Sequence, residues 1–276
     1  MSLSSFRSEN WGQLTPEQRL AELQEVENNL AAEQGRDPRE VIKQHYEPHR
    51  DEQGEIDGIT LGQYGRSEEH PEGAIYINED VLTRDDCSYE CLETVIHEGR
   101  HAYQDDHSEN KEWNHNMRGG YQDPEQEGTD RVDYRFQPVE ADANNYADAK
   151  MAEYSGEFQG DAAHNDYSYN RNLNNYADRK VAIEKYGENY EQEIQAKVEA
   201  QYQENNQGLQ SPQNSEELAM PKGNDENRTS VREQMKENNP DWKMSEAPQE
   251  QQETAMEDRT SKRDELNNIR DDGQGQ

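Results

Sequence analysis

The stretch ETVIHEGRHAYQ, residues 93–104, contains the pattern His-Glu-x-x-His within a predicted amphipathic helix. His97 and His101 are four residues apart, so they share one helix face and can direct two imidazoles at one metal ion. Glu98 is rotated by about 100° from the first histidine, so its carboxylate can reach a water on that ion without being a ligand. The apolar run TVI at residues 94–96 predicts that the helix is buried against a core.

This spacing predicts a catalytic metal site. Two neutral imidazoles and one more protein donor leave one position open on Zn²⁺. The ion lowers the pKa of a bound water toward about 7, and Glu98 would take the proton of that water during attack on a carbonyl. Glu98 would then pass the proton to the leaving amine. We therefore expect Zn²⁺ as the cofactor and a protein or peptide as the substrate.

The third metal ligand has two candidates. Glu140 is favoured; it lies in EADANNYA, at the start of a helix predicted from about residue 137. His107 is the rival, six residues after His101. On an unbroken helix it would lie about 240° around the axis from that residue. A ligand at this position needs a glycine-type turn where Gln104 stands.

Four further residues are candidates for supporting roles. Asn144 lies one turn beyond the predicted carboxylate ligand and would orient a ligand histidine. Asp105 lies one turn beyond the second histidine and would support the site or, as an alternative, act as a ligand. Tyr134 and Arg135 precede the later helix, where either would stabilise a developing oxyanion. Packing of the ring and solvation of the guanidinium are the alternative interpretation of that pair.

The rest of the chain predicts an α+β fold that is mostly helical. Thr15 is a good N-cap for a first helix, with Pro16 at the first helical position and Gln18 completing a capping box. Gly35 is expected to end this helix. Apolar residues at helical spacing predict a single later helix over roughly residues 176–202.

Three short segments rich in β-branched and aromatic residues predict a small antiparallel sheet. They are EVIKQHY at 40–46, GITLGQY at 58–64 and GAIYINE at 73–79. The last segment closely precedes the HExxH helix, so we expect its edge to bind an extended substrate. Residues 106–133 look irregular, and a loop of this length inside a compact domain is usually functional or disordered.

Composition and charge argue against several classes of function. The 276 residues include 62 acidic and 28 basic side chains, the net charge is -34, and only 29% of residues are hydrophobic. Nucleic acids and anionic membrane surfaces are therefore not expected as partners, because both are negatively charged. The apolar content is too low to fill a core along the whole chain. We expect a folded domain over 1–203 and a largely disordered acidic tail, rich in Gln, Asn and Glu, over 204–276.

Targeting signals and cysteine use point to an ordinary intracellular setting. No stretch approaches the roughly 20 apolar residues that span a bilayer, and the N-terminal MSLSSFRSENWGQL has no apolar signal region. We expect a cytoplasmic protein, or one that is exported without a cleavable signal peptide. The two cysteines, Cys87 and Cys91, are predicted to be buried packing residues with free thiols.

The segments HEGRH and EADANNYA together resemble zincin metallopeptidases of the gluzincin type. In that group, a glutamate on a later helix completes the HExxH site, and a polar residue four positions on supports it. The longer segments ETVIHEGRHAYQ and YRFQPVEADANNYA are similar to those of zincin-like domains in bacterial polymorphic toxins and related uncharacterised proteins. The resemblance covers roughly residues 11–155. It implies a zinc-dependent peptidase, toxin-like in context, with His97, His101 and Glu140 as ligands and Glu98 as general base.

Two other functions compete with the peptidase. The long polar tail favours an acidic interaction protein whose zincin-like fold has lost catalysis. Charge alone would also suit an acidic mimic or a protein that sequesters basic partners, and such binding would weaken sharply with added salt.

Overall fold

The computed structural model describes residues 2–50, 53–110, 113–123 and 129–206, and most of this part of the chain is helical. The helices are α1 (Ser8–Trp11), α2 (Pro16–Gln34), α3 (Glu79–Leu82), α4 (Ser88–Asp106), α5 (Arg131–Phe136), α6 (Pro138–Tyr154), α7 (Ala162–Tyr186) and α8 (Tyr190–Asn206). Short helical turns are η1 (Ser4–Phe6), η2 (Asn116–Gly120) and η3 (Ser155–Phe158). The strands are β1 (Glu40–Gln44), β2 (His49–Arg50), β3 (Ile56–Gly58), β4 (Gly62–Gly65) and β5 (Ala74–Asn78). The predicted α+β class is confirmed.

The strands β1, β5 and β4 form a mixed sheet in that order. β1 pairs with β5 in parallel, with Val41 opposite Ile75, whereas β4 pairs with β5 antiparallel, with Tyr64 opposite Ile75. The prediction of an antiparallel sheet is therefore wrong. The chain passes through β2, β3 and β4 between β1 and β5, and a connection of this length permits parallel pairing. The prediction of a free edge at β5 is also wrong, because β5 is the central strand and the edge strands of this sheet are β1 and β4.

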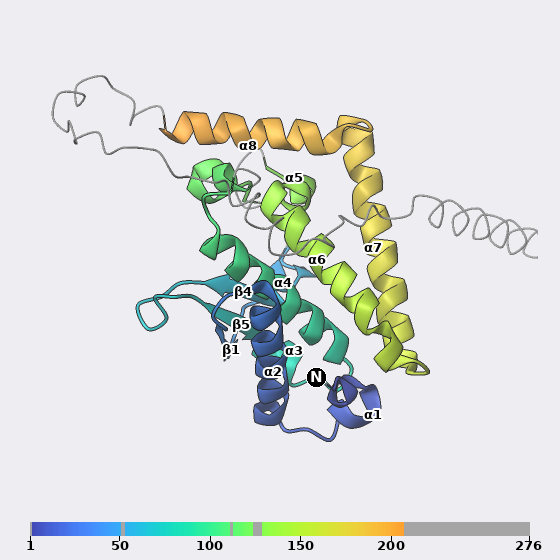
Figure 1. The fold of residues 1–276 in the computed structure, drawn as a ribbon. Helices are drawn as coiled ribbons and strands as arrows, with labels where there is room; N and C mark the ends of the chain where they lie inside the picture. The colour runs from blue at the N-terminus through green and yellow to red at the C-terminus, as the bar shows by residue number, and fades with distance from the viewer. Residues whose placement is uncertain (1, 51–52, 111–112, 124–128, 207–276) are drawn as a thin grey trace, which may run out of the picture. The chain divides into compact units, whose positions relative to one another are not determined.

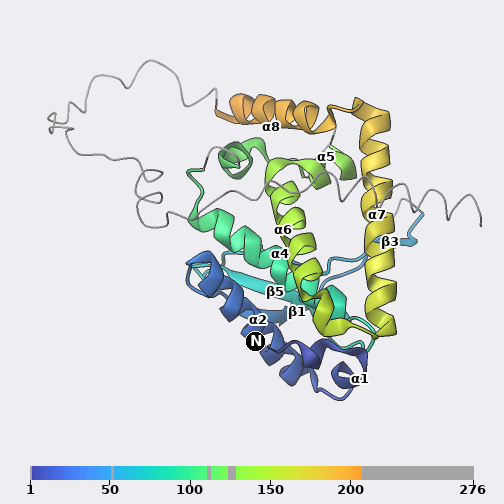
Figure 2. The same cartoon turned by 45° about the vertical axis from the view of Figure 1, so that its right-hand side comes forward.

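Helix α4 is the central element of the fold. It contacts the sheet, α2 and α6, and the ribbon views show α2 and α4 beside the sheet with α6 crossing α4 (Figure 1; Figure 2). The main core between these layers includes Leu23 and Leu30 of α2, Ile75 of β5, and Leu92 and Ile96 of α4, all 0% exposed. Burial of such side chains is the main source of folding free energy, so the helix with the HExxH pattern is held rigidly.

The first long helix begins and ends as the sequence predicts. The Thr15 side chain accepts a hydrogen bond from the Gln18 backbone, and the Gln18 side chain returns one to the Thr15 backbone, which completes the capping box. Gly35 follows the last turn of α2 with a φ of 69°, a left-handed conformation that glycine adopts at little steric cost.

The predicted single helix over residues 176–202 is two helices in the structure. α7 ends at Tyr186 and α8 begins at Tyr190, with Gly187 between them at a φ of 79°. Apolar residues continue at helical spacing across this break, so periodicity alone did not predict it. The two helices meet nearly at a corner in the ribbon view (Figure 1).

A second apolar cluster joins α5, α7 and α8, and its buried members include Val132, Ala182 and Ile194. This cluster gives α8 a packing surface of its own, apart from the main core. Of the predicted disordered tail, residues 204–206 belong to α8, and residues 207–276 lie outside the described residues.

Both cysteines are buried and free, as predicted. Burial raises the pKa of Cys87 to about 11, and burial together with the neighbouring thiol raises the pKa of Cys91 further, so both thiols stay protonated and unreactive at neutral pH. Among the helices that the structure describes, none combines the length and apolar character that a membrane span requires.

Candidate metal centre

The two histidines of the HExxH pattern lie on α4 and face the first turn of α6, where Glu140 stands. His97 Nε2 and His101 Nε2 are 3.1 Å apart. Glu140 Oε2 lies 3.4 Å from His97 Nε2, and Glu140 Oε1 lies 3.5 Å from His101 Nε2. Within the described ranges, this donor triangle is the one group of His, Cys, Asp or Glu side chains close enough to hold a metal ion. The structure thus brings together the three residues favoured as ligands.

The spacing of the donor triangle fits a tetrahedral zinc ion. Zinc binds imidazole nitrogen and carboxylate oxygen at about 2.0–2.2 Å, which separates neighbouring tetrahedral ligand atoms by about 3.3–3.6 Å. The three observed separations are 3.1, 3.4 and 3.5 Å. The side chains of His97 and His101 are 16% and 17% exposed, so both imidazoles keep some contact with solvent.

Gln104 fixes the orientation of the His101 ring. Gln104 Oε1 lies 2.7 Å from His101 Nδ1, so Nδ1 donates a hydrogen bond and the Nε2 lone pair is left for a metal. The amide nitrogen of Gln104 donates to Val139 O at 2.9 Å and to Asp142 Oδ2 at 2.8 Å. Arg100 Nε also donates to Asp142 Oδ2 at 2.8 Å. One buried amide therefore links the histidine on α4 to the turn of α6 that carries Glu140.

Asn144 does not contact either ligand imidazole through a hydrogen bond in the described structure, so the partner predicted for it is wrong. Its Nδ2 donates to Glu140 O at 2.7 Å, and its Oδ1 accepts from Arg171 Nη2 at 3.2 Å. Asn144 therefore supports the backbone of the carboxylate ligand. The group that orients an imidazole is Gln104, and its position three residues after His101 was the signal that would have predicted it.

The charges of the three donors depend on one another. Burial opposes ionisation of Glu140, which is 2% exposed, but His101 and His97 outweigh this effect and hold its pKa well below the usual range. Burial also acts to lower the pKa of His101, but the Glu140 carboxylate outweighs it and raises that pKa to about 9. A buried carboxylate needs a positive charge beside it. Here either protonated imidazoles or a bound metal ion would supply that charge.

Glu98 stands next to the donor triangle without belonging to it. Its Oε2 accepts a hydrogen bond from the backbone N–H of Tyr64 at 2.7 Å, and the residue is 8% exposed. Its charge also acts to raise the pKa of His101. Because Tyr64 belongs to the edge strand β4, Glu98 joins α4 to that strand.

Two tyrosines, Tyr121 and Tyr134, lie beside the Glu140 carboxylate. Tyr121 donates to Glu140 Oε1 at 3.0 Å, and its ring meets Tyr134 edge to face with centroids 6.1 Å apart. Burial raises the pKa of Tyr134, and the charges of Glu140 and Glu98 raise it further, so this phenol keeps its proton at neutral pH. Tyr134 was predicted as a candidate at this position. Tyr121 was not, and the only signal for it was the length of the irregular stretch 106–133.

His107 and Asp105 lie outside the donor triangle. His107 follows the last residue of α4; its Nδ1 is 2.8 Å from Tyr103 O, and its ring stacks on Tyr103 with centroids 4.2 Å apart. Asp105 Oδ2 accepts from the Tyr64 hydroxyl at 2.7 Å and from Arg66 Nε at 2.8 Å. Both candidates for metal binding are therefore committed to other contacts. Asp105 instead joins α4 to the edge strand.

Arg135 faces α7 rather than the metal centre. Its Nη2 donates to Asn175 Oδ1 at 2.6 Å, and its Nε lies 3.4 Å from Asp178 Oδ2. Of the two candidates for oxyanion stabilisation, only Tyr134 lies beside the site. Arg135 is a packing residue between α5 and α7. The prediction of an oxyanion role for Arg135 is wrong.

A buried ion pair contacts the backbone of α4 between His97 and His101. Arg36 donates to Glu27 Oε1 and Oε2 at 2.6 and 2.9 Å, and Arg36 Nη2 also donates to Gly99 O at 2.9 Å. A Cβ atom at Gly99 would lie 2.8 Å from Glu27 Oε2. The glycine between His97 and His101 therefore lets this ion pair dock against the helix backbone.

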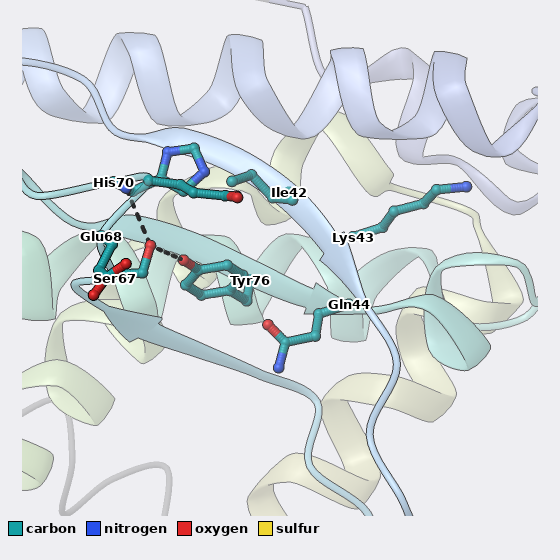
Figure 3. A pocket seen from close by; sticks show the side chains of 8 residues that line it. Ile42, Lys43, Gln44, Ser67, Glu68, His70 and Tyr76 are labelled. Atoms are coloured by element: carbon teal, nitrogen blue, oxygen red, sulfur yellow. Dashed lines mark hydrogen bonds between the residues drawn. The ribbon is translucent and has the colours of Figure 1, made fainter.

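A shallow pocket lies elsewhere, on the sheet (Figure 3). It is lined by Ile42, Lys43, Gln44, Ser67, Glu68, Glu69, His70 and Tyr76. Tyr76 is half-buried, whereas its sequence neighbours Ile75 and Ile77 both lie in the core. Because successive side chains of a strand alternate between faces, the Tyr76 ring lies on the opposite sheet face. None of the three donor residues contributes to this pocket.

Comparison of the chain with protein-family models, curated proteins and solved structures gives no match. The resemblance to zincin metallopeptidases therefore stays a prediction. The geometry of the site is the basis for the function proposed for this chain.

Proposed function

We propose that the protein is a zinc-dependent peptidase with His97, His101 and Glu140 as its metal ligands. The observation that carries the proposal is the donor triangle, with separations of 3.1, 3.4 and 3.5 Å where α4 meets α6. Structural zinc sites usually have four protein ligands, whereas catalytic sites have three and an open position. Two imidazoles and one carboxylate, with both histidine side chains partly exposed to solvent, match the catalytic kind.

Each residue of the site has a separate task in the proposed hydrolysis. When bound, Zn²⁺ would act as a Lewis acid and lower the pKa of water toward about 7. Glu98 would accept a proton from the attacking water and later deliver it to the leaving nitrogen. The Tyr121 or Tyr134 hydroxyl would donate a hydrogen bond to the oxygen on which negative charge develops.

An extended peptide is the substrate class that suits the surroundings of the site. Strand β4 is at the edge of the sheet, and an added strand would pair with its backbone whatever the substrate side chains are. The contact between Glu98 and the Tyr64 N–H shows how close that edge is to the proposed base. A peptide along β4 would bring its own carbonyl groups beside Glu98 and the donor triangle.

Hydrolysis of fluorogenic peptides by the zinc-loaded full chain tests this proposal. We expect the wild-type protein to cleave, and Glu98→Gln to retain zinc but lose activity by at least about a hundredfold, since general base catalysis contributes that much. Glu188→Gln, which changes an exposed glutamate in the same way, should cleave like the wild type. Equal cleavage by Glu98→Gln would overturn the assignment. Stoichiometric zinc without any cleavage would favour the inactive interaction protein instead.

A further inference from the structure

The loop that carries Tyr121, residues 113–123, is held by helix α8. Three side-chain amides of α8 donate to loop carbonyls: Asn206 Nδ2 to Arg118 O at 3.2 Å, Asn205 Nδ2 to Gly119 O at 2.6 Å, and Gln201 Nε2 to Tyr121 O at 3.0 Å. Gln201 Oε1 also accepts from Gln122 Nε2 at 2.5 Å. The last turns of α8 therefore hold the loop backbone at Tyr121 and just before it, and the Gln122 side chain just after it.

The fit between α8 and this loop is close enough to restrict the loop sequence. A Cβ atom at Gly120 would lie 2.6 Å from Val198 O of α8, so a larger residue there would push the helix away. Gly119 has a φ of 111°, which favours glycine. The His115 ring stacks on Tyr202 of α8 with centroids 4.1 Å apart. The loop and the helix thus pack together as one surface.

A second anchor ties the same loop to the start of α6. Gln137 is 0% exposed and immediately precedes α6. Its Oε1 accepts from Asn116 Nδ2 at 2.7 Å and from the Gln122 backbone N–H at 2.8 Å, and its Nε2 donates to Gln122 O at 3.2 Å. Because Glu140 lies in the first turn of α6, this buried amide places the loop relative to the carboxylate ligand.

We infer that α8 acts as a clamp that positions the Tyr121 hydroxyl over the metal centre, with Gln201 and Asn205 as its positioning residues. The clamp reaches the loop backbone and not the metal donors, while the loop delivers the hydroxyl to Glu140 Oε1 at 3.0 Å. α8 has its own apolar cluster with α5 and α7, so it can hold the loop independently of the main core. The catalytic part of this inference rests on the proposed peptidase function.

Substitution of Gln201 and Asn205 in the full chain tests the hold of α8 on the loop separately from catalysis. In Gln201→Ala/Asn205→Ala we expect faster amide hydrogen exchange at residues 118–122 and unchanged exchange at residues 97–101. Zinc stoichiometry should stay the same, and kcat should fall roughly tenfold to a hundredfold with little change in KM, because a misplaced group weakens only the transition state. Gln203→Ala, an exposed glutamine on the same helix, should change none of these quantities.

A double-mutant comparison distinguishes positioning from general loss of structure. Once Tyr121→Phe has removed the hydroxyl, the two amide substitutions should lower kcat no further. Unchanged exchange at residues 118–122, or a loss of kcat that adds in full to that of Tyr121→Phe, would overturn the clamp. If the wild-type chain cleaves nothing, the peptidase proposal fails, and the exchange result alone still decides whether α8 holds the loop.

Discussion

Gln104 Oε1 lies 2.7 Å from His101 Nδ1, and the same side chain donates to Asp142 Oδ2 on α6 at 2.8 Å. One amide thus sets the tautomer of a proposed ligand and fixes the distance between the two helices that supply the donors. Side chains that hydrogen-bond to a metal ligand strengthen metal binding, because they orient the ligand before the metal binds.

Replacement of Gln104 by alanine should weaken zinc binding by roughly tenfold to a hundredfold, since His101 would lose its hydrogen-bonding partner. The quantity to measure is the zinc dissociation constant, by competition with a chromogenic chelator. Gln13→Ala, at an exposed glutamine, is the matched control and should leave the constant unchanged. Equal zinc affinity in Gln104→Ala and the wild type would show that Gln104 does not orient the ligand.

Replacement of Glu140 by glutamine should reduce zinc affinity by more than about a hundredfold, because the carboxylate charge and one donor are lost together. His107→Ala should bind zinc like the wild type, because His107 packs on Tyr103 outside the donor triangle. Equilibrium dialysis with metal analysis of both variants decides between the two residues. Loss of zinc from His107→Ala with full retention in Glu140→Gln would reverse the assignment.

A methyl group at Gly99 should destabilise the fold by about 1–3 kcal/mol through overpacking. The Cβ atom of Gly99→Ala would lie 2.8 Å from Glu27 Oε2 and 3.1 Å from Arg36 Nη2 in a buried ion pair. Gly156→Ala is the control, because a Cβ atom there meets nothing within 4 Å, and its effect should stay within about 0.5 kcal/mol. Urea unfolding of both variants measures the difference. Equal stabilities would mean that the ion pair moves aside at no cost.

Stability in acid should depend on Asp133, a buried carboxylate between α5 and the last two helices. Burial acts to raise its pKa, but hydrogen bonds from Lys197, Tyr186 and Lys185 outweigh burial and lower the pKa below its ordinary value of 3.8. A lowered folded-state pKa contributes stability above 3.8, and that contribution is lost as the pH falls through the folded value.

The matching measurement is the free energy of unfolding as a function of pH for the wild type and Asp133→Asn. The variant should be less stable at neutral pH, and the difference should shrink as the solution is acidified past the folded-state pKa. Asp166→Asn changes an exposed aspartate and should follow the wild-type curve. A difference that grows in acid would contradict the sign expected from the lowered pKa.

The histidine pair of the donor triangle, and the place of Glu140 on its own helix, could be predicted because they depend on local structure. A spacing of four residues places His97 and His101 on one helix face whatever the rest of the fold does. Pro138 at the first helical position fixes where the later helix begins, and Glu140 then falls in its first turn. The caps of α2 were predictable for the same reason, since Thr15, Gln18 and Gly35 act within a few residues.

The parts that escaped prediction depend on long-range contacts. The direction of β1 relative to β5 is set by the path of the whole connection between them, and the residues of each strand do not encode it. Tyr121 contacts Glu140 from a loop that is hydrogen-bonded to Gln137 and Gln201, and those contacts join residues far apart in the chain. The break between α7 and α8 occurs at Gly187, and the apolar pattern continues across it.

Anomalous diffraction at the zinc absorption edge, from crystals of the zinc-loaded full chain, tests the central claim most directly. The account predicts one strong peak within about 2.0–2.2 Å of His97 Nε2, His101 Nε2 and a Glu140 carboxylate oxygen. A zinc-loaded crystal with no peak between α4 and α6, or with its zinc held by other side chains, would contradict it.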